Sequence, residues 1–117
     1  MTTNQIAKVC YETNRAYCQT INDNSQNIWE EAPEWQRISA INGVTFHLLN
    51  PGSGPSHSHD NWLEEKLAGG WKYGPMKDPA KKEHPCCVPY AELPAAQKAK
   101  DALFSAVVNA LRDQHQS

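Results

Sequence analysis

The sequence has no long apolar run and no strong excess of either charge. No segment approaches the roughly 20 consecutive apolar residues that span a bilayer. Residues 1–5 lack the basic start and the apolar stretch of a secretory signal peptide. The formal net charge of −2 argues against a general nucleic-acid-binding protein, which usually carries a marked basic excess. We therefore expect a soluble, cytoplasmic protein that binds neither a membrane nor a nucleic acid polymer.

Common motifs of phosphate, metal and thiol chemistry are also missing. Neither Gly-x-Gly-x-x-Gly nor a Walker pattern occurs, and the sequence lacks the paired Cys-x-x-Cys clusters of structural zinc sites. His84 and Cys86 are the residue types of a base and a nucleophile, but no third orienting group is evident. We therefore expect no metal site, no cofactor and no enzymatic activity. The four cysteines are expected to be free thiols, because the cytoplasm is reducing.

The length and hydropathy of the chain fit one domain. The 117 residues, 1–117, have room for one domain with a single hydrophobic core. Apolar residues make up 39% of the chain and the mean hydropathy is −0.70. The core must therefore come from well-placed apolar stripes rather than from general hydrophobicity.

Apolar residues recur at helical spacing in four segments. The predicted helices are residues 4–20, residues 33–49, a third that Ser56 or Ser58 caps and Gly69-Gly70 ends, and a fourth that opens at Pro94 and frays from Asp113. Thr2 and Gln5 form a capping box at the start of the first. Residues 71–92 contain four prolines, so they predict an ordered loop with short extended pieces around 86–88. The predicted fold is mainly α, a compact four-helix domain with a long Pro- and aromatic-rich loop between helices 3 and 4.

A basic island lies within this acidic chain. Residues 66–84 contain five lysines against two acidic residues, which favours a small anion over a long polyanion as the ligand. Trp62, Trp71 and Tyr73 lie in or beside this basic segment, so several aromatic rings can lie at the entrance of one binding site. Stacking a base on such a ring contributes about 1–3 kcal/mol. The residues themselves therefore favour a site for a small, planar anion.

Several motifs together resemble the RyR domain, the repeat named after ryanodine-receptor calcium channels. The pattern Gly-Trp-x-Tyr-Gly-Pro-x-Lys-Asp occupies residues 70–78 and is followed by His-Pro-Cys at 84–86; residues 10–15 and 32–37 add to the likeness. The resemblance extends over about 6–111 and implies a compact helical domain. In the channels such repeats occur in tandem pairs, and they are similar to stand-alone bacterial and phage versions for which nucleotide sensing has been proposed.

The resemblance also implies a ligand and an assembly. The family picture includes a purine-type nucleotide stacked on tryptophans from paired repeats. This sequence holds one copy and no membrane segment, which argues against channel activity. A site built between two copies would therefore require a homodimer here, and we expect one.

We expect a small-ligand-binding domain for a nucleotide-derived molecule, either a cyclic nucleotide or an ADP-ribose-type signal. It would sequester that signal, for example as a phage counter-defence protein. The alternative is a protein-interaction or oligomerisation module without a small ligand, because tryptophan and tyrosine are also favoured at interfaces.

The predicted ligand-binding residues are Arg15, Trp62, Lys66, Trp71, Lys72, Tyr73, Gly74 and Lys77. The rings would stack, the lysines would pair with the ligand's charge, and the glycine would permit close backbone approach. For Trp62 and Trp71 a purely structural role is weighed equally, and Trp29 and Trp35 are expected to pack. For Arg15 we favour an ion pair with a carboxylate such as Glu34 over phosphate contact.

Overall fold

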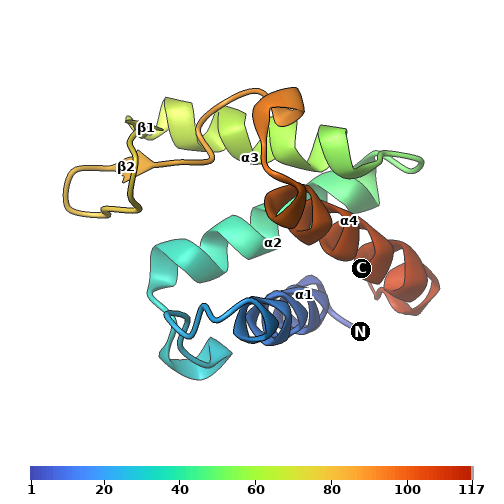
Figure 1. Cartoon of the computed structure of the whole chain (residues 1–117). Coiled ribbons are helices and arrows are strands. Elements are labelled where there is room, and N and C mark those ends of the chain that lie inside the picture. The colour runs from blue at the N-terminus through green and yellow to red at the C-terminus, as the bar shows by residue number, and fades with distance from the viewer. Residues whose placement is uncertain (117) are drawn as a thin grey trace.

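Four α-helices dominate the computed structural model, which describes residues 1–116 (Figure 1). They are α1 (Thr3–Thr20), α2 (Glu34–Leu49), α3 (Pro55–Ala68) and α4 (Ala95–Leu111). Three short 3-10 turns, η1 (Trp29–Glu31), η2 (Tyr90–Glu92) and η3 (Arg112–Gln114), flank them. Two parallel strands, β1 (Lys72–Tyr73) and β2 (Glu83–His84), lie in the loop between α3 and α4. The mainly α, four-helix prediction is confirmed.

The helix starts follow from local hydrogen bonding. At α1 the Thr2 hydroxyl accepts from the Gln5 backbone N–H while the Gln5 side chain accepts from the Thr2 N–H, so the predicted capping box is confirmed. At α3 the prediction of a serine cap is wrong. The helix begins at Pro55, whose missing N–H and fixed φ suit the first helical position, and the Gly54 N–H donates to Nδ1 of His57 at 3.1 Å.

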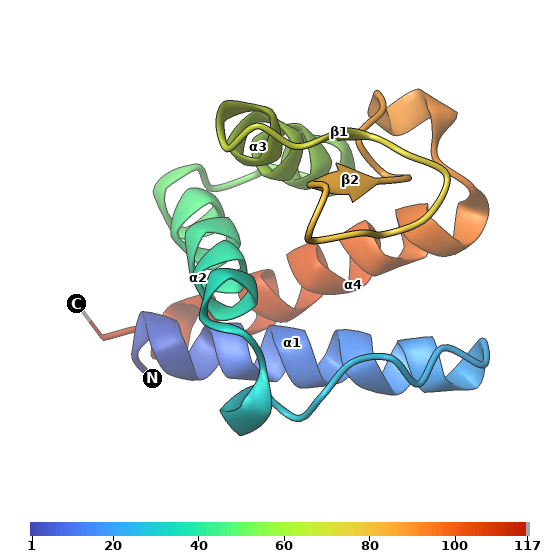
Figure 2. The same cartoon turned by 90° about the vertical axis from the view of Figure 1, so that its left-hand side faces the viewer.

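The extended pieces of the loop lie elsewhere than predicted. They fall at 72–73 and 83–84 rather than around 86–88, and Lys72 pairs with Glu83 and Tyr73 with His84. Figure 2 shows this strand pair beside α3, with the intervening chain looping outward. The pair depends on contacts between residues eleven positions apart, which local propensity does not encode.

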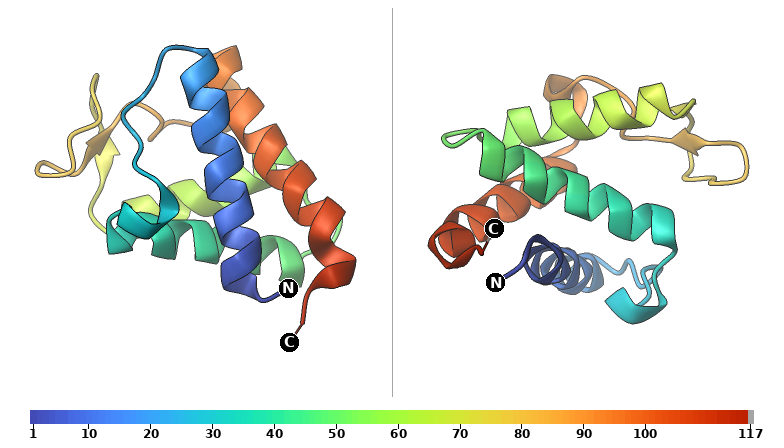
Figure 3. Two further views of the ribbon diagram at one scale, coloured as in Figure 1. Left: turned by 90° about the horizontal axis from the view of Figure 1, so that it is seen from below. Right: turned by 180° about the vertical axis from the view of Figure 1, so that it is seen from behind.

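The core lies where α1, α2 and α4 meet. Ile6, Ala7, Cys10, Val44 and Val108 form its buried centre. Helices α1 and α4 lie side by side with α2 and α3 packed across them (Figure 3, left). The two termini meet at one end, where the Gln116 N–H donates to the Met1 carbonyl at 2.8 Å. Within residues 1–116, no helix combines the length and the apolar character needed to cross a bilayer.

A histidine interrupts this core. His47 of α2 is 0% exposed, and neither of its ring nitrogens has a hydrogen-bond partner in the described part of the chain. Burial lowers the pKa of His47, and the nearby Arg112 guanidinium lowers it further. The same guanidinium donates to the carbonyls of His47 (2.8 Å) and Leu48 (3.3 Å), and so satisfies the C-terminal end of α2.

The buried histidine makes stability depend on pH. Because the pKa of His47 in the fold is below its ordinary 6.5, the unfolded chain takes up the proton first, and stability is lost as pH falls from 6.5 toward the folded-state pKa. We expect His47→Leu to raise the free energy of unfolding by about 1 kcal/mol near neutral pH, since it removes unpaired polar atoms. Urea unfolding at neutral and at mildly acidic pH measures both effects. An equal loss on acidification in the variant and the wild type would contradict this role for His47.

Candidate functional site

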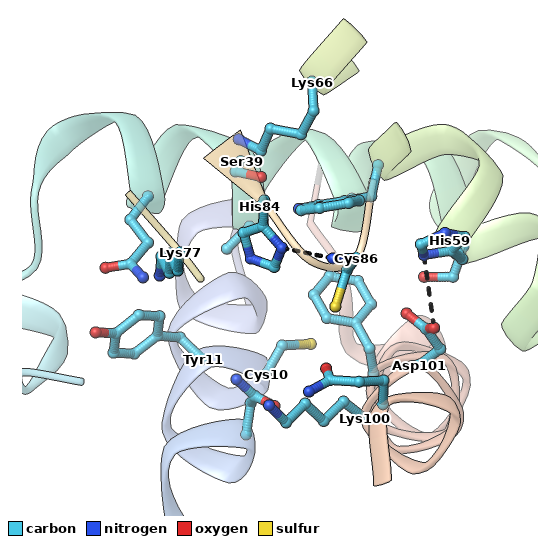
Figure 4. A pocket seen from close by; sticks show the side chains of 18 of the residues that line it. Cys10, Tyr11, Ser39, His59, Lys66, Lys77, His84, Cys86, Lys100 and Asp101 are labelled. Carbon is cyan, nitrogen blue, oxygen red and sulfur yellow. Dashed lines mark hydrogen bonds and ion pairs between the residues drawn. The ribbon is translucent and has the colours of Figure 1, made fainter. Parts of the chain in front are cut away.

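A cavity of about 410 Å³ lies between the helices and the 71–92 loop. Small-molecule sites typically have volumes of about 300–1,000 Å³. All four helices contribute to its lining, with Tyr11 from α1, Ser39 from α2, Lys66 from α3 and Lys100 from α4, while β2 contributes His84 (Figure 4). The cavity therefore depends on the tertiary fold and not on one segment.

One wall of the cavity is a cage of three indoles around an ammonium group. The Lys66 Nζ lies 5.1 Å from the ring centroid of Trp35, 5.9 Å from that of Trp62 and 5.6 Å from that of Trp71. Trp35 and Trp71 contact each other with centroids 5.4 Å apart. Each cation–π contact contributes about 0.5–2 kcal/mol, the larger value when water is excluded. Lys66 is only 5% exposed, so these contacts are largely shielded from water.

Local sequence explains how the cage assembles. Trp62 and Lys66 are four residues apart and lie on one face of α3. After the helix, Gly70 adopts a φ of +88°, a left-handed conformation that glycine reaches without steric cost, and turns the chain back. The Trp71 N–H then donates to the Lys66 carbonyl at 2.9 Å, which places the indole over the lysine. Glu65 Oε1 pairs with the same ammonium at 3.1 Å.

Two further lysines face the cavity. The Lys77 Nζ lies 5.5 Å from the centroid of Trp35, and Lys100 lines the cavity from α4. Although much of the Lys77 side chain is exposed, burial around its ammonium end lowers its pKa. Asp23 is the carboxylate nearby: hydrogen bonds from Ser25 lower its pKa most, and the positive charges of Lys100 and Lys77 add to this.

His84 lies among these cations and is neutral at pH 7. Burial lowers its pKa to about 4, and the charges of Lys77, Lys66 and Lys100 act in the same direction. The Cys86 backbone N–H donates to His84 Nδ1 at 3.0 Å, so in the neutral ring the proton is on Nε2. Its ring is 5.0 Å from that of Trp62, centroid to centroid.

The cavity also has an acidic part. Asp101 of α4 lines it, and burial raises the pKa of this carboxyl to about 6, while the nearby His59 and Lys100 limit the rise. His59 Nδ1 lies 3.9 Å from Asp101 Oδ2, and His59 Nε2 is 2.7 Å from the Val88 carbonyl oxygen. Polar atoms without partners add to the lining: Asn14 Oδ1 and Gln26 Oε1 make no hydrogen bond within residues 1–116.

The structure brings half of the predicted residues together. Trp62, Lys66, Trp71 and Lys77 all line the cavity. Trp62 and Lys66 belong to α3, and Trp71 and Lys77 to the loop that follows the Gly69-Gly70 turn. The aromatic and basic parts of the predicted site therefore meet at one place.

The other four predicted residues lie outside the lining. Lys72 and Tyr73 are exposed on β1, where Lys72 pairs loosely with Glu83 at 3.8 Å and Tyr73 is 58% exposed. Arg15 forms the expected kind of ion pair, but with Glu12 at 3.0 Å rather than with Glu34. Gly74 is buried and permits close approach of Glu83 rather than of a ligand, because a Cβ at this position would lie 2.6 Å from the Glu83 Cβ.

Sequence reasoning missed several lining residues. Trp35 was expected to pack, and it does contact Trp71, but it also faces the cavity. Tyr11 and Trp35 lie inside the segments 10–15 and 32–37 that carried the family resemblance, so a signal for both was available. Lys100 had none, since a single lysine in an amphipathic helix is usually solvated.

The nucleophile and metal alternatives find little support in the geometry. Burial raises the pKa of Cys86 to about 11, so the sulfur is a thiol rather than a thiolate at neutral pH. His84 uses its Nδ1 for the backbone N–H of Cys86 rather than for the thiol. Nowhere in the described chain do three or more potential ligands among His, Cys, Asp and Glu gather for a metal ion. The absence of enzymatic activity stays a prediction.

A comparison with known families finds one match. The model of the RyR domain matches residues 55–112, which begin at the first residue of α3 and reach just past the end of α4. The matched segment contains Trp62, Lys66, Trp71 and His84 of the cavity lining. The helices α1 and α2 lie before it and complete the cavity.

The role of Gly74 is testable through stability. We expect Gly74→Ala to lower the free energy of unfolding by about 1–3 kcal/mol, because the added methyl group clashes with Glu83 and overpacks the strand pair. Gly69→Ala is the matched control, since a Cβ there meets its neighbours at 3.5 Å or more, an ordinary contact distance. Urea unfolding compares the two. If both substitutions left stability unchanged, Gly74 would have no structural role.

Proposed function

The chain belongs to the RyR domain family, and we propose on that basis that it binds a small, nucleotide-derived anion of cyclic-nucleotide or ADP-ribose type. The observation that carries the proposal is the cavity of about 410 Å³, which three indoles and three ammonium groups line together. Indoles offer flat surfaces for a base, and ammonium groups offer charge-assisted hydrogen bonds to a phosphate.

Before the cost of association is subtracted, the expected contacts reach the free energy of a micromolar complex. Stacking contributes about 1–3 kcal/mol per base, and a hydrogen bond to a charged group about 1.5–3 kcal/mol. Two of each approach the roughly 8 kcal/mol of a micromolar complex. Trp35, Trp62 and Trp71 already lie around Lys66. Their side chains therefore lose little conformational freedom when a ligand binds.

The charge pattern favours a small ligand over a polymer. The chain as a whole is acidic, with a formal net charge of −2, while three lysines line one partly enclosed site. A long polyanion would meet the acidic surface outside the cavity. We therefore propose that the protein acts in the cytoplasm and that it binds neither a nucleic acid polymer nor a membrane.

Calorimetry with cyclic AMP, cyclic GMP and ADP-ribose tests this proposal. We expect saturable binding that weakens with added salt, and a loss of about tenfold or more in affinity for Trp71→Ala, because a stacking surface is removed. Tyr73→Ala is the aromatic control, since this ring lies next along the chain but outside the cavity. Lys77→Gln and Lys81→Gln form the corresponding charged pair, with only Lys77 in the lining.

The competing function is a protein-interaction module. Exposed apolar side chains near the loop favour it: Leu67 is 55% exposed, Tyr73 58% and Met76 75%. Of these residue types, tyrosine and methionine are enriched at protein interfaces. Two results together would favour this function over the first. Calorimetry would detect no binding of any of the nucleotides, and a protein partner would bind the wild type but not Met76→Ala.

We propose that the protein acts by sequestering this nucleotide signal, as a phage counter-defence protein would. A sequestering protein takes up its signal in stoichiometric amount and returns it chemically unchanged. We expect mass spectrometry of the small molecules released by heating the purified protein to give an intact nucleotide. A product that accumulates with time, and that Cys86→Ala abolishes, would instead establish an enzyme.

A homodimer is part of the proposal and has its own measurement. Because one chain supplies the whole described lining, a second copy would add to the site rather than create it. We expect light scattering to give the mass of a dimer in the presence of the nucleotide that binds. A monomeric mass both with and without that nucleotide would exclude the dimer and leave the binding proposal intact.

A further inference from the structure

His84 has a ring donor without a hydrogen-bond partner among residues 1–116. Its Nδ1 accepts the Cys86 N–H at 3.0 Å, so the neutral ring must carry its proton on Nε2. Within residues 1–116 that Nε2–H makes no hydrogen bond, and the ring lines the cavity (Figure 4). A donor of fixed tautomer that lies between the rings of Trp62 and Trp71 is suited to recognising an acceptor atom of a ligand.

The surroundings of His84 keep it neutral and favour an anion beside it. Positive groups face it from three segments, with Lys66 on α3, Lys77 in the loop and Lys100 on α4; His59 of α3 is the neighbouring titratable ring. A positive imidazolium would be repelled by these ammonium groups. An acceptor oxygen with negative charge would instead be attracted by all of them and by the Nε2–H.

The amount of charge that the cavity can take is limited. Its lining holds three ammonium groups, against which stand the carboxylates of Asp23 and Asp101. Glu65, just outside the lining, offsets part of the charge of Lys66 at 3.1 Å. The small positive excess that remains is balanced by a single negative charge. A polyphosphate would bring uncompensated charge into a partly enclosed site, which is costly.

From these observations, and on the basis of the proposed function, we infer that His84 is a ligand-binding residue whose Nε2–H donates to the anionic oxygen of a singly charged, phosphodiester-type nucleotide. The phosphodiester lies beside Lys66 and Lys77, and the base stacks on the neighbouring indoles. Among nucleotide classes, cyclic mononucleotides carry this one charge and one base.

The inference has a direct spectroscopic consequence. An anion in contact with the Nε2–H favours the protonated ring, and an opposite charge at such a distance raises a pKa by about 1–3 units. The pKa of His84, about 4 in the free protein, therefore rises when cyclic AMP is bound. NMR titration of the histidine ring nitrogens, with and without saturating cyclic AMP, measures this shift and the tautomer together. A His84 pKa that stays at its free value in the bound protein overturns the inference.

A pair of variants tests the contact by affinity. We expect His84→Phe, which keeps a flat ring but removes the donor, to weaken cyclic AMP binding about tenfold or more. His57→Phe is the matched control: His57 also accepts a backbone N–H at Nδ1, from Gly54 at 3.1 Å, but does not line the cavity. Equal affinities of the two variants would overturn the role of His84. If His84→Phe does not fold, the NMR titration of the wild-type protein decides.

A charge series separates this inference from the proposed function. Cyclic AMP, AMP and ADP share a base and differ in negative charge, and we expect affinity to fall along that order. Binding that strengthens from cyclic AMP to ADP overturns the single-charge inference while the proposed function stands. The absence of binding for all three and for cyclic GMP and ADP-ribose overturns both.

Discussion

The Lys66 ammonium, held between three indoles, is the interaction on which the site depends. Its partners Trp35, Trp62 and Trp71 come from α2, α3 and the following loop, so one cation joins three segments of the chain. A methyl-bearing side chain in its place would fill the same space but would gain nothing from the quadrupoles of the rings. The wall is therefore both aromatic and charged, and this distinguishes the cavity from the apolar core formed by α1, α2 and α4.

Local signals in the sequence predicted most of the fold. Period-3.6 stripes located all four helices, and the Thr2–Gln5 capping box is present as expected, because both features depend on near neighbours. The start of α3 was missed, since a proline at the first helical position was read as part of a turn. The two-residue strands escaped prediction because only the tertiary fold brings residues 72–73 beside 83–84.

The site was predictable only where its residues are close in sequence. Trp62 and Lys66 follow from spacing on one helix face, and Trp71 follows because a glycine turn returns the chain to that face. Lys72 and Tyr73, next in the chain, lie outside the lining, because proximity in sequence does not fix the direction of a side chain. The contributions of α1, α2 and α4 required the packing of distant helices, which composition and periodicity do not specify.

The half-buried carboxyl of Asp101 makes the distribution of charge in the cavity uneven. In Figure 4, Lys77 and Asp101 lie on opposite sides of His84, so the carboxylate of Asp101 is separated from the Lys77 ammonium across the cavity. Under the proposed function, a ligand with one anionic end would have one preferred orientation, with that end toward Lys77. A molecule with a phosphate at each end would place one of them against a carboxylate, a juxtaposition that disfavours binding. Under the proposed function, Asp101 would therefore select against ligands that are anionic at both ends.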